Sequence, residues 1–235
     1  MSAKYMLIAG TALLIMACAK KEGSTPQQTQ DNAAAQVSVS EAAEKAESAA
    51  EPGFDASAAP TGVYKNDPGH SYIAFSYNHM GYSNPIARWG SWTADLNWNS
   101  EDPAQSSIAA SIDAASIDTG VAELDDHLRS PDFFEVEKFP TISFASTSLE
   151  VTGSDAARLI GDLTIKGVTK PVAFDVKINK AADDDFAKAY KIGFSAKGMI
   201  KRSDFGVDLY TPMVGDDISF TIEVEFIQPK DLAGQ

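Results

Sequence analysis

Residues 218–226 read ISFTIEVEF, and this stretch decides the fold. Its apolar residues occupy every second position from Ile218 to Phe226, and Ser, Thr and Glu fill the positions between them. Successive side chains of a β-strand point to opposite faces of a sheet. The alternation therefore predicts a strand with one buried face and one face in water.

The same two-residue rhythm recurs along the chain after residue 62. Turn-forming clusters separate the runs, at residues 66–69, 152–155 and 183–185. Alternating runs divided by turn signals are typical of an antiparallel meander, here of roughly eight strands. The inward positions of the further runs are Ile73, Phe75 and Tyr77; Trp92, Ala94, Leu96 and Trp98; Ile108, Ala110 and Ile112; Phe174, Val176 and Ile178; and Ile192, Phe194 and Ala196.

Helix is scarce in this pattern. One short helix is predicted at residues 121–129, where Leu124 and Leu128 share a face at four-residue spacing. A sheet with one apolar face must cover that face with a second sheet or close on itself, and closure also removes exposed edges. We therefore predict an all-β fold, an antiparallel barrel of roughly eight strands with one short helix. A barrel of this size is filled by side chains or holds one small ligand, and periodicity leaves both interiors open.

The N-terminal residues look like a processing signal. Lys4 precedes a mostly apolar run at residues 7–16, which is too short to span a bilayer, and Ala17 precedes Cys18. We predict a lipoprotein signal peptide at residues 1–17 and lipidation of Cys18, the single cysteine, which leaves no partner for an internal disulfide. Ala19 resembles the sorting pattern of the outer membrane, so we expect a periplasmic protein anchored there.

The segment after the cysteine is poor in large apolar residues. Residues 18–61 are rich in Ala, Gln, Ser, Glu and Thr and contain one large apolar residue, Phe54. Such a segment buries too little surface to offset the entropy of ordering, so a disordered tether is predicted there and the barrel domain at residues 62–230. The formal net charge of -14 argues against nucleic acid as a partner, because phosphates require clustered cations.

Five blocks of sequence resemble the YceI family of lipocalin-like periplasmic proteins. They are DPGHSYIAFSYNHMGYSNPIARW at 67–89, SIDTG at 116–120, HLRSPDFFEVEKFPTISFAS at 127–146, GDLTIKGVTKPVAF at 161–174 and RSDFGVD at 202–208. The resemblance covers residues 63–227. It implies an antiparallel barrel that binds a polyisoprenoid, such as an isoprenoid quinone or a polyprenyl phosphate, in an elongated internal channel. One departure is Leu124, where many members of the family carry arginine.

An isoprenoid tail needs an apolar lining, with polar groups only near its head group. Inward-facing aromatic residues are therefore the candidate lining as a group, although ordinary core packing is the favoured explanation for any single one of them. Two polar residues, His79 and Arg202, are candidates for the head group. The candidate lining residues are Phe75, Tyr77, Trp89, Trp92, Phe133, Phe134, Phe139, Phe144 and Phe174.

Other functions have weaker support in the sequence. The three histidines, His70, His79 and His127, do not have a spacing that indicates convergence on a metal, so no metal site and no cofactor beyond the lipid is expected. No catalytic motif accompanies the cluster Asp118, Asp126, His127, Arg129 and Asp132. A small hydrolase or isomerase using this cluster, and a solid-core interaction module, are the alternatives to a lipid carrier. Homodimerisation is left open.

Overall fold

The computed structural model describes residues 55–231. The predicted signal peptide, Cys18 and the tether as far as residue 54 lie outside the described residues. Eleven strands of residues 55–231 form one antiparallel sheet, in the order β1-β4-β5-β7-β8-β9-β10-β11-β2-β3-β6. The strands are β1 (Gly62–Asn66), β2 (Tyr72–His79), β3 (Ile86–Trp89), β4 (Trp92–Trp98), β5 (Ser107–Asp113), β6 (Ile117–Asp118), β7 (Thr141–Val151), β8 (Ala156–Ile165), β9 (Val168–Asp184), β10 (Ala189–Lys201) and β11 (Val214–Pro229).

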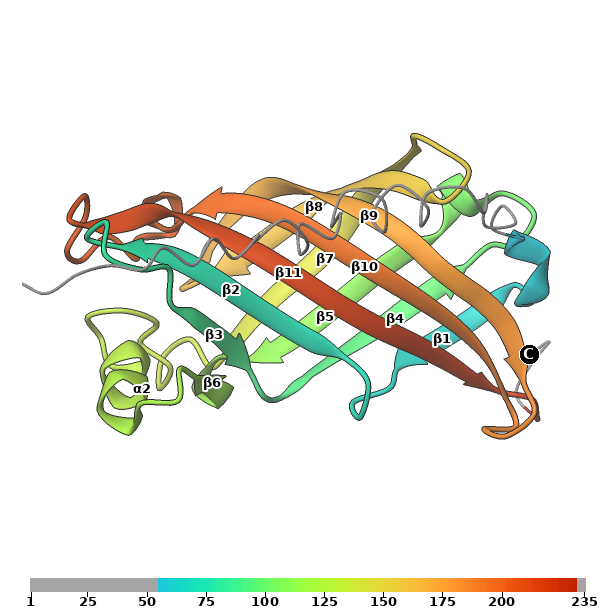
Figure 1. Cartoon of the computed structure of the whole chain (residues 1–235), viewed down its shortest axis with the longest axis horizontal. Helices are drawn as coiled ribbons and strands as arrows, with labels where there is room; N and C mark the ends of the chain where they lie inside the picture. The colour runs from blue at the N-terminus through green and yellow to red at the C-terminus, as the bar shows by residue number, and fades with distance from the viewer. Residues whose placement is uncertain (1–54, 232–235) are drawn as a thin grey trace, which may run out of the picture. The chain divides into compact units, whose positions relative to one another are not determined.

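The sheet closes into an eight-stranded barrel because β11 pairs with three strands. It pairs with β10 from Asp217 to Pro229. On its other edge, its first part, from Val214 to Glu223, pairs with β2, and its last part pairs with β1 through Lys65 opposite Ile227. β1 and β2 are thus two consecutive segments along the same edge of β11, separated by the turn at residues 67–71 (Figure 1). The predicted antiparallel barrel of about eight strands is confirmed.

The predicted alternation of β11 is also confirmed. Ile218, Phe220, Val224 and Phe226 are buried and Ile222 is half-buried, whereas Thr221 and Glu223 between them are exposed. Burial of the apolar face contributes about 25 cal/mol for each Å² of apolar surface removed from water. The hydrophobic effect therefore fixes the register of this strand, since a slip of one residue would turn its charged face inward.

The one α-helix within residues 55–231, α2 (Ala122–Arg129), matches the predicted helix at 121–129. It lies at one end of the barrel next to β3 and β6 (Figure 1), and Leu128 packs against the core. At the other end lies a short 3₁₀ helix, η1 (Ala56–Ala58). No helix in the described part of the chain is long and apolar enough to cross a bilayer.

Residues 55–61, which the sequence assigned to the tether, pack against the end of the barrel. Ala59 is fully buried, and its carbonyl accepts a hydrogen bond of 3.2 Å from Trp98 Nε1. The Pro60 carbonyl accepts one of 2.7 Å from the hydroxyl of Tyr64, which is itself fully buried. Small side chains thus let this segment cover the barrel end through its backbone groups, a role that composition does not reveal.

Candidate functional site

A cavity of about 340 Å³ occupies part of the barrel interior. Residues of β2 to β5 and β7 to β11 surround it, and almost all of them are aliphatic, aromatic or alanine. The interior is therefore not filled by the protein's own side chains, which excludes the solid-core alternative. The residues of the strands that line the cavity are Ile73, Trp89, Trp92, Leu96, Trp98, Ser107, Ile108, Ala110, Ile112, Ile142, Phe144, Leu149, Val151, Ala156, Ala157, Leu159, Leu163, Ile165, Phe174, Val176, Ile178, Phe194, Ala196, Phe220, Ile222, Val224 and Phe226.

Aromatic rings close one end of the cavity. Trp89 stacks on Phe220, with ring centroids 6.3 Å apart and planes inclined by 9°, and both rings line the cavity. Phe75 packs behind Trp89 at 4.7 Å, and Phe134 meets its edge at 6.0 Å. The Nε1 atom of Trp89 is buried and has no hydrogen-bond partner among the described residues. This end of the cavity is thus a floor of aromatic rings on the side of α2, and the Trp89 N–H is its unpaired polar group among the described residues.

The opposite end of the cavity is its mouth. Here the lining residues belong to η1, to the β4–β5 connection with its 3₁₀ helix η2 (Pro103–Gln105), and to the β7–β8 turn. Asp102, Ala104, Gly153 and Ser154 among them are exposed. The polar lining residues gather at this end as Asp102, Ser106, Ser107 and Ser154. A ligand with a long apolar tail and a polar head would therefore place its tail toward the floor and its head at the mouth.

The structure brings four of the nine predicted lining residues to the cavity: Trp89, Trp92, Phe144 and Phe174. Phe144 and Phe174 meet edge to face at 5.7 Å across neighbouring parts of the wall. Contact of these four residues with a ligand stays a prediction. All three tryptophans of the chain line the cavity, since Trp98 joins Trp89 and Trp92 there.

The other five predicted lining residues lie elsewhere. Phe75 and Tyr77 belong to the packed core beyond the floor. Phe133, Phe134 and Phe139 follow α2, where Phe133 packs against the His127 ring at 4.9 Å and Phe139 lies under the ammonium group of Lys138. Alternation predicts that a side chain points inward, but it does not give the height at which that side chain lies along the barrel axis.

The two predicted head-group residues do not line the cavity. Arg202 is buried, and its guanidinium donates to four backbone carbonyls, those of Val207 at 2.8 Å, Leu209 at 2.9 Å, Gly215 at 2.9 Å and Val214 at 3.0 Å. Its donors thus hold the loop before β11. His79 is exposed at the end of β2, and its backbone pairs with Ser83.

The candidate lining residues were all aromatic, so the aliphatic part of the lining was missed, although many of its residues were predicted to face inward. Some aliphatic lining residues were not predicted to face inward either. Leu149 and Val151 are examples, because an extra residue in β7 changes the inward set of positions there. Ile142 and Phe144 line the cavity before this irregularity, at even positions, and the two missed residues line it afterwards at odd positions. The sequence does show this change, because the large apolar residues of β7 lie at even-numbered positions before Thr147 and at odd-numbered positions after it.

The polar cluster around α2 has structural partners. Arg129 donates to the carbonyls of Ala115 and Ile117 and pairs with Asp126 at 3.0 Å, while the His127 ring lies 3.4 Å from Asp132. Asp118 pairs with Arg88 and accepts the Gly120 amide, and these two contacts lower the pKa of its carboxyl, with the amide contributing most. The cluster does not line the cavity, and its interactions tie α2 to β3 and β6.

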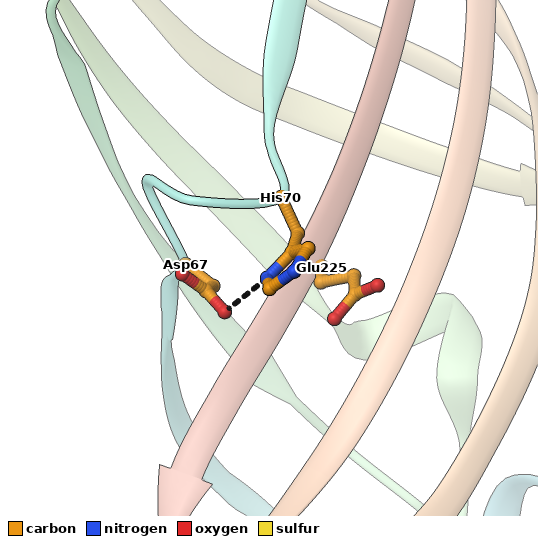
Figure 2. A group of neighbouring side chains, drawn as sticks. All are labelled: Asp67, His70 and Glu225. Atoms are coloured by element: carbon orange, nitrogen blue, oxygen red, sulfur yellow. Dashed lines mark hydrogen bonds and ion pairs between the residues drawn. The ribbon is translucent and has the colours of Figure 1, made fainter.

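A second polar group lies outside the barrel wall where β1 gives way to β2. Figure 2 shows Asp67, His70 and Glu225, whose potential ligand atoms lie within 4.8 Å of one another. His70 Nδ1 contacts Asp67 Oδ2 at 2.8 Å, and Lys191 Nζ contacts Glu225 at 3.1 Å. These residues have the chemistry of metal ligands, but Lys191 already compensates the charge of Glu225. The three histidines of the chain do not share this site, since His79 and His127 lie on β2 and α2.

Known proteins with similar sequences identify the family of this chain. The family model of the YceI-like domain matches residues 64–226. Protein YceI of Escherichia coli O17:K52:H18 is 34% identical over 179 residues, which cover 75% of this chain and 93% of that protein. A UPF0312 protein of Serratia proteamaculans is 35% identical over 161 residues, which cover 68% of this chain and 83% of the relative.

Solved structures show the same barrel. The Campylobacter jejuni YCEI protein matches with a TM-score of 0.59 at 31% identity, over 65% of this chain and 90% of that one. A polyisoprenoid-binding domain from Saccharophagus degradans matches with a TM-score of 0.57 at 13% identity, over 72% and 99% of the two chains, which is a likeness of fold. The sequence matches and the barrel together show that this chain belongs to the family of proteins with a YceI-like domain.

Proposed function

We propose that this protein binds an isoprenoid lipid, such as an isoprenoid quinone or a polyprenyl phosphate, inside the barrel. The observation that carries the proposal is the apolar cavity, which has an aromatic floor at one end and polar residues at the mouth. Family membership supports it, and so does the Saccharophagus degradans neighbour, which is described as a polyisoprenoid-binding domain. Both point to a binding protein rather than an enzyme.

The physical basis is the transfer of branched hydrocarbon out of water. Each Å² of apolar surface that the cavity removes from water contributes about 25 cal/mol. An isoprenoid tail carries no charge and no hydrogen-bonding groups, so a lining of aliphatic and aromatic side chains meets all its needs. The direct test is extraction of the purified protein with organic solvent, followed by mass spectrometry. Absence of isoprenoid from the extract, together with no affinity for added quinone or polyprenyl phosphate, would contradict the proposal.

A matched pair of variants tests the cavity itself. Ala110 lines the cavity, whereas its neighbour Ala109 on β5 is exposed on the outer face. Ala110→Phe should fill part of the cavity and reduce lipid loading at least about tenfold, because the tail loses the space and the surface it would bury. Ala109→Phe makes the same chemical change outside the barrel and should load normally. Equal loading of the two variants, measured by extraction, would place the lipid elsewhere.

We propose further that the protein works in the bacterial cell envelope, anchored to the periplasmic face of the outer membrane by a lipid on Cys18. The proposal rests on the signal-like residues 1–17, the cysteine that follows and Ala19. Cys18→Ser should release the protein from the membrane fraction while leaving the barrel able to bind lipid. Retention of that variant in the membrane would argue against a lipid anchor at Cys18.

A further inference from the structure

We infer that the cavity selects isoprenoids whose head group is uncharged, such as a quinone or an alcohol, and discriminates against isoprenoids that end in phosphate. This inference rests on the proposed function, because it concerns the same cavity. It narrows the class of ligand through the charges that surround the mouth.

The head group of a bound lipid must lie at the mouth, because the residues at the floor are buried and leave no contact with water there. Trp89 is 5% exposed and Leu163 is 5% exposed, and both lie at the floor. At the mouth Val151 is 55% exposed, and the neighbouring lining residues Asp102 and Ser154 are exposed as well. A polar head group keeps its contact with water only at that end.

The three segments that frame the mouth are acidic. Residues 55–61, 99–106 and 152–155 contain Asp55, Glu101, Asp102 and Asp155 and no Lys, Arg or His. Donation from the side chain and the backbone of Ser57 lowers the pKa of the Asp55 carboxyl. Asp102 lines the cavity, so one carboxylate adjoins the place where a head group would lie.

Cations do not offset these carboxylates from within the cavity. Among residues 55–231, no Lys, Arg or His belongs to its lining. Lys177 on β9 alternates with Val176 and Ile178, which line the cavity, so Lys177 faces outward. Lys230 pairs with Asp183 and Asp185 in the β9–β10 hairpin. Arg202, the buried arginine, lies near the other end and donates to backbone carbonyls.

A phosphate monoester carries a charge of about −1.5 to −2 at neutral pH and is stabilised in proteins by cationic donors. At this mouth the phosphate would lie near carboxylates, and like charges repel each other even where water partly screens them. A quinone carbonyl or an alcohol needs only a hydrogen bond, and the hydroxyl of Ser154 can supply one. The mouth thus fits a neutral head group.

The test compares two ligands with one tail, geranylgeraniol and geranylgeranyl phosphate, on the full-length protein after delipidation. Tryptophan fluorescence reports binding, since all three tryptophans line the cavity. The alcohol should bind at least about tenfold more tightly than the phosphate at low ionic strength, and the ratio should shrink as salt screens the carboxylates. A phosphate that binds as tightly as the alcohol would overturn the inference.

Charge reversal at the mouth separates electrostatics from shape. In the double variant Glu101→Lys and Asp155→Lys, neither changed residue lines the cavity, so the alcohol should bind as before while the phosphate gains at least about fivefold. The control is Glu123→Lys with Glu137→Lys at the α2 end, which changes the net charge equally and should leave the ratio unaltered. An unchanged ratio in the mouth variant would overturn the inference, whereas binding of neither ligand by the unaltered protein would contradict the proposed function itself.

Discussion

Two glycines on the inner face of the barrel set the positions of two aromatic cavity residues. A side chain at Gly161 would collide with the Phe144 ring, and one at Gly198 would collide with the Phe174 ring. Each ring therefore packs over a glycine on a neighbouring strand. The absence of a Cβ atom gives these rings their orientation in the cavity wall.

Gly198→Ala should destabilise the barrel by about 1–3 kcal/mol, because an added methyl group in a packed interior forces its neighbours to shift. Its Cβ would lie 2.5 Å from Phe174 Cδ1 and 3.0 Å from the Ala173 carbonyl oxygen. Gly193→Ala on the same strand is the control, since its Cβ would meet nothing nearer than 3.9 Å. Urea unfolding measures both variants, and equal stabilities would contradict this account of Gly198.

Arg202 shows how tertiary contacts decide the role of a residue. From the sequence, an arginine in RSDFG is a candidate for a ligand's head group. In the fold, its planar guanidinium satisfies four backbone carbonyls around the loop before β11. Those carbonyls come from residues 207–215, and only the folded loop brings them around one side chain. No local pattern in the sequence could predict that convergence.

At the scale of elements, the alternating runs predicted strands reliably and failed at irregularities. β11, β4 and β9 contain the predicted inward positions because their alternation is regular over those runs. In β7, the extra residue Thr147 shifts the register between Ser146 and Ser148, and the inward set changes parity. A bulge is visible only when the partner strand is known, because it is defined by two residues facing one.

The turn that joins β1 to β2 should make stability depend on pH. The hydrogen bond between His70 Nδ1 and the carboxylate of Asp67, which accepts it, is the main cause that raises the pKa of His70, and the same bond is the main cause that lowers the pKa of Asp67. Glu225 and Lys191 are the other charged groups that face this pair. The contribution of His70 is present below its ordinary pKa of about 6.5 and is lost as pH rises through the folded-state pKa. That of Asp67 is present above its ordinary pKa of about 3.9 and is lost as pH falls through the folded-state pKa.

His70→Gln should therefore lower the free energy of unfolding more at pH 5.5 than at pH 8.5, as measured by urea titration at both values. The matched control is His79→Gln, because His79 forms no ion pair with the residues described and lies at the far end of β2. A penalty for His70→Gln that is the same at both pH values would show that the pair with Asp67 contributes nothing through its charge.

At the scale of the whole barrel, the interior divides into two parts. On the α2 side, large aromatic residues such as Phe75, Trp89 and Phe220 fill the space. Toward the mouth, Ala110, Ala157 and Ala196 face the interior from three different strands and leave it unfilled. Closure brings these small side chains around one space, and the segment at residues 55–61 covers part of the barrel end through Ala59.

A bound lipid should stabilise the barrel by mass action. At a free ligand concentration of 100 times Kd, the gain is about 2.7 kcal/mol, which corresponds to a rise of about 5–10 °C in Tm for a domain of this size. Calorimetry of the delipidated protein, with and without geranylgeraniol, measures the shift, and Ala110→Phe should largely abolish it. A Tm that does not respond to the ligand would contradict binding to the folded barrel.

The sequence by itself determined the strands, their inward faces, the short helix and the closed antiparallel barrel, because side-chain alternation and turn residues are local properties. It also supplied four aromatic residues that line the cavity. Only the tertiary structure decided that the barrel holds a cavity and where its floor and mouth lie. It also decided that the guanidinium of Arg202 donates its hydrogen bonds to backbone carbonyls. The physical reason is that volume and charge at a site are sums over residues far apart in the chain, and closure of the sheet is what brings them together.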